Sequence, residues 1–151
     1  MLSWLKTFFH RGSGTNPVGL GADRAAAGAA GERAAAEFLQ RKRGFAVVAR
    51  NWRSPRDRRD ELDLVCREGE VLVFVEVKTR AAHALVTGYD AINARKKKAL
   101  RRACATYLRA LGAAQPRTFR FDVVEVSTHV GVGPPELRHF ENVPLFPKNF
   151  V

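Results

Sequence analysis

The sequence contains few of the residues that cross-link a small domain or anchor it in a lipid bilayer. Only two of its 151 residues are cysteines. Cys66 and Cys104 stand far apart among apolar neighbours, which predicts two buried thiols and no disulfide framework. The apolar stretch at the N-terminus is broken by Lys6, far short of the roughly 20 residues that span a membrane, and no signal-peptide cleavage site follows it. Four scattered histidines have no zinc-ligand spacing: His10, His83, His129 and His139. These absences favour a protein of the reducing cytoplasm.

Acidic residues are scarce relative to basic ones. The chain has 15 Asp and Glu against 26 Lys and Arg, for a net charge of +11. The resulting positive field attracts polyanions, and nucleic acid is the commonest of these partners. An anionic membrane surface, or a solvated basic surface without a partner, would also fit the charge alone. With 46% hydrophobic residues, the chain is too apolar to be wholly disordered, and its length suits one domain.

The pattern of apolar residues predicts an α/β domain over residues 22–127. A flexible or amphipathic N-terminal tail (1–21) precedes it, and an irregular C-terminal tail (128–151) follows. Helices are predicted over 22–43 and 90–111, and strands over 45–51, 61–67, 71–78 and 118–126. For the order α-β-β-β-α-β, one mixed central sheet flanked by helices is the natural arrangement.

Acidic side chains interrupt two of the apolar strands. In VLVFVEVK, over residues 71–78, alternation places the valines on one face and Glu76 with Lys78 on the other. In ELDLV, over 61–65, Asp63 alternates with Leu62 and Leu64. A hairpin through the turn at 68–70 would bring Asp63 opposite Glu76. Two adjacent carboxylates repel unless a cation or proton lies between them, and Mg²⁺ or Mn²⁺ bound through oxygen is the usual answer.

A third acid lies in the first predicted helix. Glu32 shares an i, i+3, i+4, i+7 stripe with Ala35, Ala36 and Leu39, and this stripe should face the core. A carboxylate there needs a partner or a metal. A surface helix position for Glu32, and a simple cross-strand ion pair of Glu76 with Lys78, remain open alternatives.

Basic residues surround these acids in the sequence. A band over residues 95–102 lies on the second helix, where either a solvated face or phosphate contacts would fit. Trp52 is expected to be a core anchor. The candidate nucleic-acid contacts are Arg53, Arg58, Arg59, Arg80, Lys96 and Lys97, of which Lys96 is expected nearest the acids; Arg56 lies in the same loop as Arg58.

Several segments match, in order, a known family. They are residues 31–39, RNWR at 50–53, ELDLV at 61–65, FVEVKTR at 74–80, residues 96–108 and FDVV at 121–124, with a weaker match at 139–142. In this set the chain resembles the bacterial YraN-like family of predicted endonucleases, in the PD-(D/E)xK nuclease superfamily, which is similar to archaeal Holliday-junction resolvases. One departure is Asp60, where the family usually has glycine; its side chain would alter the loop or add a carboxylate near the ion.

The resemblance implies a restriction-endonuclease-like core and a metal-dependent site. Asp63 and Glu76 would hold Mg²⁺ or Mn²⁺, with the Val77 carbonyl as a further ligand. Glu32 would complete the cluster directly or through water. Lys78 would position or deprotonate the attacking water, or neutralise charge on the phosphorane.

Two functions follow as hypotheses. The first is an endonuclease that hydrolyses phosphodiester bonds in DNA, including branched or structured DNA, with RNA as a less favoured substrate. The alternative is a non-catalytic module that binds nucleic acid on a nuclease fold. Resolvase-like proteins that cut paired strands are often dimers, so a homodimer is one expected assembly.

Overall fold

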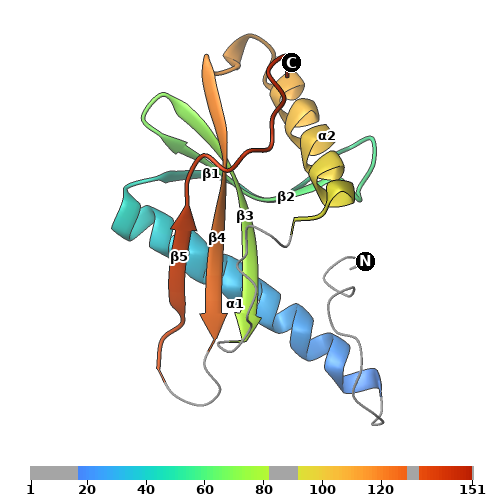
Figure 1. Ribbon diagram of the computed structural model, residues 1–151, viewed down its shortest axis with the longest axis vertical. Helices are drawn as coiled ribbons and strands as arrows, with labels where there is room; N and C mark the ends of the chain where they lie inside the picture. Colours follow the sequence, from blue (N-terminus) through green and yellow to red (C-terminus); the bar gives the residue numbers. More distant parts are fainter. Residues whose placement is uncertain (1–16, 82–91, 129–132, 151) are drawn as a thin grey trace.

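The computed structural model describes residues 17–81, 92–128 and 133–150, and within them two helices cover the faces of a five-stranded sheet (Figure 1). The elements run along the chain as α1 (Pro17–Arg43), β1 (Ala46–Arg53), β2 (Glu61–Glu68), β3 (Val71–Ala81), α2 (Ala94–Leu111), the short 3-10 helix η2 (Gly112–Ala114), β4 (Thr118–Thr128) and β5 (Glu136–Phe140). The strands lie side by side in sequence order, and all neighbours are antiparallel except β3 and β4. The predicted α/β class with a mixed, helix-flanked sheet is confirmed, and it is consistent with a restriction-endonuclease-like core.

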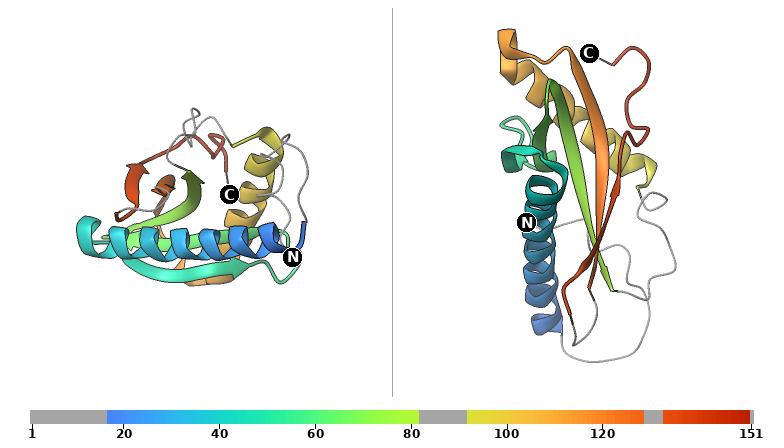
Figure 2. Two further views of the ribbon diagram at one scale, coloured as in Figure 1. Left: turned by 90° about the horizontal axis from the view of Figure 1, so that it is seen from below. Right: turned by 90° about the vertical axis from the view of Figure 1, so that its left-hand side faces the viewer.

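The two faces of the sheet bury two separate apolar clusters. On one face, Val73, Val75 and Val77 pack under the Ala35, Ala36 and Leu39 stripe of α1. On the other face, Phe74 packs among side chains of α2. Figure 2 shows the two helices on different sides of the sheet. The alternation predicted for β3 is therefore correct, and it determines which helix each side chain of that strand faces.

The helix α1 lies very close to β3 at Gly31. A Cβ atom added to Gly31 would come within 2.0 Å of the Thr79 hydroxyl oxygen, closer than any real Cβ contact. Glycine is therefore required at this position by the packing of the helix against the strand. The close contact of Gly31 with Thr79 fixes the position of the next residue, Glu32, relative to the sheet.

The predicted starts of both helices are wrong. α1 begins at Pro17 and not at Ala22, so residues 17–21 are helical instead of part of a tail; residues 1–16 lie outside the described part. α2 begins at Ala94 and not at Asp90, because the Asn93 side chain caps it by accepting the Lys96 N–H at 2.9 Å.

The C-terminal segment is not wholly irregular. Residues 136–140 form β5, which pairs with β4 from Val123↔Phe140 to Ser127↔Glu136. The short strand follows Gly133-Pro134-Pro135 and has too few residues for a clear alternation, so the pairing partner is what makes it a strand.

Leu62 was expected to share a face with Leu64 but does not. Leu62 belongs to the cluster beneath α2, whereas Leu64 belongs to the cluster beneath α1. The reason is that the β2–β3 ladder ends at Leu64↔Val75, and beyond it β2 pairs only with β1, through Trp52↔Leu62. Trp52 packs edge-on against Tyr107 of α2 there, as a core anchor should. Among the described helices, none is long and apolar enough to cross a membrane.

Candidate active site

A row of polar residues crosses three strands where β2 separates from β3. It consists of Asn51 of β1, Asp63 of β2 and Glu76 of β3, and we call it the acidic row. The predicted register of the hairpin is confirmed from Glu68↔Val71 to Leu64↔Val75, where the ladder ends, one step before the predicted pair of Asp63 and Glu76. Asp63 instead meets β3 through the Val77 N–H, and its carboxylate lies within electrostatic reach of Glu76. On the other side, β1 pairs Arg50 with Leu64 and Trp52 with Leu62, so that Asn51 stands opposite Asp63. The separation of the two strands opens space for these side chains.

Asp63 links the two strands where their backbone ladder ends. Its Oδ2 accepts the Val77 N–H at 2.8 Å. Burial and the neighbouring Glu76 carboxylate raise the pKa of Asp63 well above its usual range, and the Lys96 ammonium and the Val77 hydrogen bond oppose this only in part. Asp63 is therefore a carboxyl group that lacks enough positive charge close to it.

Glu76 is nearly inaccessible, with 2% of its surface exposed. Its Oε1 lies 3.1 Å from the Lys78 ammonium and its Oε2 lies 3.2 Å from the Lys96 ammonium. Burial acts to raise the pKa of Glu76, but the two ammonium groups outweigh burial and hold the pKa below its usual value. Glu76 is thus ionised and bridges β3 and α2.

Lys96 has a different position from the one expected of a surface phosphate contact. Its residue is 6% exposed, and its side chain points inward from the first turn of α2 to Glu76. The prediction that Lys96 is the member of the basic run nearest the acids is confirmed, but its ammonium group binds Glu76 in the core and is not a surface contact. The cap at Asn93 fixes the start of α2 and so the direction of this side chain.

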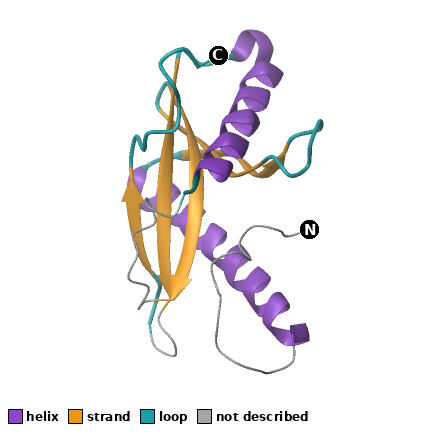
Figure 3. Cartoon of the chain, turned by 45° about the vertical axis from the view of Figure 1, so that its right-hand side comes forward, coloured by secondary structure: helices purple, strands orange, loops and turns teal. Residues whose placement is uncertain are grey.

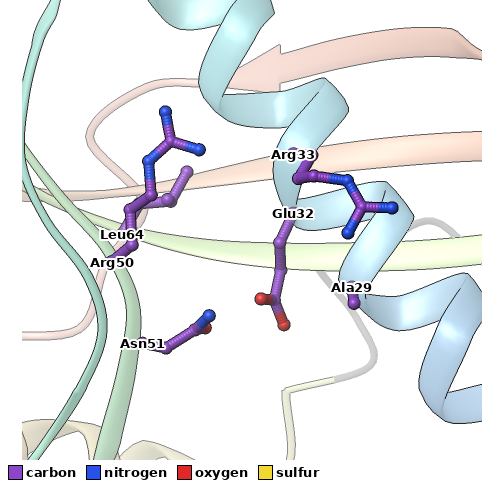
Figure 4. Close-up of a pocket in the computed structure, with 6 residues that line it drawn as sticks. All are labelled: Ala29, Glu32, Arg33, Arg50, Asn51 and Leu64. Atoms are coloured by element: carbon purple, nitrogen blue, oxygen red, sulfur yellow. The ribbon is translucent and has the colours of Figure 1, made fainter.

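Glu32 reaches toward the same region from α1. It lines a small hollow of about 100 Å³ with Asn51, and Figure 4 shows the two side chains directed toward one another. Burial raises the pKa of Glu32, a hydrogen bond with Asn51 opposes the rise, and the charges of Glu61 and Glu76 add to it. Glu32 is therefore within electrostatic reach of Glu76, although it is oriented by Asn51.

Asn51 is a residue of this site that the sequence analysis did not single out. Its φ of 49° lies in the left-handed region, which asparagine tolerates better than most residues. The backbone at this point of β1 turns the amide toward Glu32. The segment RNWR was visible in the sequence, but the positive φ that orients Asn51 was not.

The donor set partly fits a hard divalent cation. Among the residues described, no three Asp, Glu, His or Cys side chains are close enough to hold a metal together. Asp63 and Glu76 can supply two carboxylates, and a backbone oxygen is available as a third donor. Because the N–H and C=O of one strand residue point to the same side, the Val77 carbonyl lies on the edge where its N–H meets Asp63. Glu32 would then act through a water.

The other predicted residues lie around this row but mostly have acidic partners. Arg53 is 3.3 Å from Glu61, Arg59 is 2.8 Å from Asp57, and Arg80 is 3.6 Å from Glu125. Arg58 is exposed and Lys97 half-buried, and neither forms an ion pair within the described part of the chain. The structure thus brings together Glu32, Asp63, Glu76, Lys78 and Lys96, and leaves the arginines of the loop at the surface.

Asp60 does not add a carboxylate to the site. It is 5% exposed, and Arg102 of α2 donates to both of its oxygens, at 2.6 and 3.0 Å. Asp60 therefore attaches the loop between β1 and β2 to α2. Asp122 likewise has a structural position, completely buried and bonded to Arg120, to His139 of β5 and to the Asn142 N–H.

Comparison with known proteins identifies the family. A model of an uncharacterised protein family, UPF0102, matches residues 31–126. The chain belongs to the UPF0102 family. The matched span contains the whole acidic row together with Lys78 and Lys96. The YraN-like resemblance is thereby confirmed at the level of the family.

Curated UPF0102 proteins from several bacteria are similar to the chain. The protein from Symbiobacterium thermophilum is 48% identical over 99 residues, which are 66% of this chain and 80% of the relative. The protein from Nitratidesulfovibrio vulgaris is 46% identical over 104 residues, 69% of this chain and 74% of the relative. The protein from Anaeromyxobacter dehalogenans is 40% identical over 122 residues, 81% and 86% of the two chains.

Proposed function

We propose that this UPF0102 protein is a metal-dependent endonuclease that hydrolyses phosphodiester bonds in DNA. The observation that carries the proposal is the pair Asp63 and Glu76, two carboxylates beside the end of the β2–β3 ladder whose charges act on one another, in a chain of net charge +11. Acids that face a polyanion weaken simple binding, so their presence at the end of the β2–β3 ladder needs a chemical reason. The resemblance to the PD-(D/E)xK nucleases, including archaeal Holliday-junction resolvases, favours DNA and branched DNA as substrates.

Each residue has a role in this proposal that its position allows. Asp63 and Glu76, with the Val77 carbonyl, would hold Mg²⁺ or Mn²⁺. The bound ion would lower the pKa of a water and offset charge on the phosphoryl oxygens. Lys78, whose side chain is 12% exposed against 5% for Lys96, is the ammonium with access to a phosphate. Lys96, the more buried of the two ammonium groups, keeps Glu76 ionised. Glu32, together with Asn51, would orient a water.

The test is a cleavage panel of single-stranded, duplex, flap and four-way DNA, with Mn²⁺ and with chelator. Cleavage should require Mn²⁺ or Mg²⁺ and should fall by at least about 100-fold in Asp63→Asn and in Lys78→Met. Glu70→Gln is a matched control, because Glu70 is an exposed acid in the turn at the other end of the same hairpin. Cleavage that persists in chelator, or in both site variants, would refute the assignment. An RNA panel decides between the two nucleic acids.

A non-catalytic nucleic-acid-binding module is the second candidate, and one observation favours it. Both oxygens of Glu76 already have an ammonium within 3.2 Å, so part of the acidic charge is compensated without a metal. Calorimetric titration with Mn²⁺ separates the two functions. Heat of binding that disappears in Asp63→Asn supports the nuclease, whereas tight DNA binding with no detectable Mn²⁺ site supports the module.

A further inference from the structure

A second concavity, lined by charged side chains among apolar ones, lies on the surface, away from the acidic row. The loop between β1 and β2, residues 54–60, comes against α2 (Figure 3) and borders a groove of about 490 Å³. Four arginines line it, Arg56 from the loop and Arg101, Arg102 and Arg109 from α2, together with Asp57 and Asp60. The groove is therefore cationic in its lining.

The wall formed by the loop is held in place by hydrogen bonds. Ser54 is 2% exposed; its N–H donates to the Asp60 carbonyl at 2.9 Å, and its hydroxyl oxygen accepts the Arg56 N–H at 3.2 Å. The two bonds from Arg102 to Asp60 then join this wall to α2. The groove is thus built before any ligand arrives, which reduces the ordering cost of binding.

The two acids of the groove are already neutralised. Asp60 is paired with Arg102, and Asp57 with Arg59. Arg56 and Arg109 form no ion pair within the described residues, and Arg109 makes only a 3.4 Å contact with the Thr106 hydroxyl. Their guanidinium groups therefore supply unbalanced charge, in a form that matches the oxygens of a phosphate.

The groove and the acidic row are joined by one helix. Lys96, in the first turn of α2, contacts Glu76. The exposed cations of the same helix lie on one face, at i, i+3, i+7 and i+14 counted from Arg95: Arg95, Lys98, Arg102 and Arg109. At about 1.5 Å of rise per residue, Arg102 and Arg109 are about 9 and 20 Å along the axis from Lys96. At about 3.4 Å per nucleotide of duplex, these distances correspond to about three to six nucleotides.

We propose that this groove binds the sugar-phosphate backbone of a nucleic acid about three to six nucleotides from the phosphate that lies at the acidic row. The distance rests on the proposed function, but the binding itself does not. A recessed groove between a loop and a helix admits a narrow phosphate strand, whereas a flat anionic bilayer would contact only its rim. Nucleic acid is therefore the polyanion that the shape favours.

The test compares two variants of equal charge by fluorescence anisotropy of a labelled DNA duplex, in chelator so that no cleavage occurs. Arg56→Gln with Arg109→Gln removes the unpaired groove cations and leaves the Asp60–Arg102 contact intact. Arg41→Gln with Lys42→Gln removes two exposed cations from the last turn of α1, which covers the opposite face of the sheet. The groove variant should bind at least about tenfold more weakly and lower the slope of log K against log salt by about 1.8, and the control by much less.

Two results would overturn the proposal. Equal losses in both variants would show that only the overall charge matters. An unchanged DNA affinity of the groove variant, with reduced binding to vesicles that contain phosphatidylserine, would assign the groove to membranes. The outcome is distinct from that of the nuclease test. If the groove variant alone loses DNA binding in a protein that never cleaves DNA, the groove is supported and the nuclease is refuted. If the protein cleaves DNA but both variants lose binding equally, the nuclease is supported and the groove is refuted.

Discussion

At the scale of single residues, Asp63 and Glu76 show how two interacting carboxylates acquire pKa shifts of opposite sign. Glu76 lies between the ammonium groups of Lys78 and Lys96, and these lower its pKa despite its burial. Asp63 has a backbone N–H as its bonded neighbour, and burial together with Glu76 raises its pKa. The metal-free pair is therefore an ionised Glu76 beside an Asp63 that retains its proton to a higher pH.

The first prediction is that Asp63→Asn stabilises the metal-free protein at alkaline pH. A carboxyl with a raised folded-state pKa contributes stability below its unfolded pKa, and this contribution is lost as the pH rises through the folded pKa. Asparagine keeps an oxygen for the Val77 N–H and carries no charge. Urea unfolding in chelator should show a gain on the order of 1–3 kcal/mol near pH 9 and almost none near pH 4. A loss of stability near pH 9 would contradict it.

The second prediction concerns Glu76→Gln, which should have the opposite sign. The variant leaves Lys96, with 5% of its side chain exposed, without its anion, and should lose about 3 kcal/mol at neutral pH. The pKa of Glu76 is lowered, so its contribution is present above the unfolded pKa and is lost as the pH falls through the folded one. The difference from wild type should therefore shrink in acid. Adding Lys96→Met should recover part of the stability; no recovery in urea unfolding would show that the ion pair is not the cause.

At the scale of elements, the sequence predicted what depends on local patterns. The alternation in VLVFVEVK correctly placed Glu76 on the face of β3 that is away from the valines, and the two-residue turn at 69–70 set the hairpin register up to Leu64↔Val75. The prediction from the sequence failed where contacts between distant segments determine the local structure. β5 is a strand because β4 lies beside it, Leu62 changes face because β2 leaves β3, and Asn51 orients Glu32 through a positive φ. The acidic residues of the site could be recognised in the sequence because they interrupt apolar segments. Asn51, which orients Glu32, could not be recognised in this way.

The third prediction tests the close contact of α1 with β3. Gly31→Ala places a Cβ atom 2.0 Å from the Thr79 hydroxyl oxygen and should cost about 1–3 kcal/mol in urea unfolding. Gly21→Ala is the matched control on the same helix, because no atom lies within 4 Å of the added Cβ; it should stabilise by about 0.5–1 kcal/mol. Thr79→Ala, combined with Gly31→Ala, should recover much of the loss. Equal changes in the free energy of unfolding at both glycines would mean that helix propensity alone, and not the contact with Thr79, determines the effect.

At the scale of the whole molecule, the acidic row lies where the two apolar clusters meet. Val77 belongs to the cluster under α1, whereas Lys96 and Leu100 come from the helix over the other face. Side chains from both helices reach the row because β2 and β3 separate there. An ion held by Asp63 and Glu76 would therefore stabilise the packing of β2, β3 and α2 at once, and the stability of the entire fold should report on its binding.

The last prediction follows from this coupling. Mn²⁺ at the proposed site would bind the folded chain and not the unfolded one, so saturating Mn²⁺ should raise the Tm; at a concentration of 100 times the Kd the expected gain is about 2.7 kcal/mol. The ion needs an ionised Asp63, whose pKa is raised, so the proton must leave before the metal binds. The rise in Tm should therefore be larger near pH 8.5 than near pH 6, and calorimetry should record proton release at the lower pH. Asp63→Asn should abolish the rise at both. A shift that is independent of pH, or equal in Asp63→Asn, would place the metal elsewhere on the protein, because Asp63 is the carboxyl of the row whose pKa is raised well above its usual range.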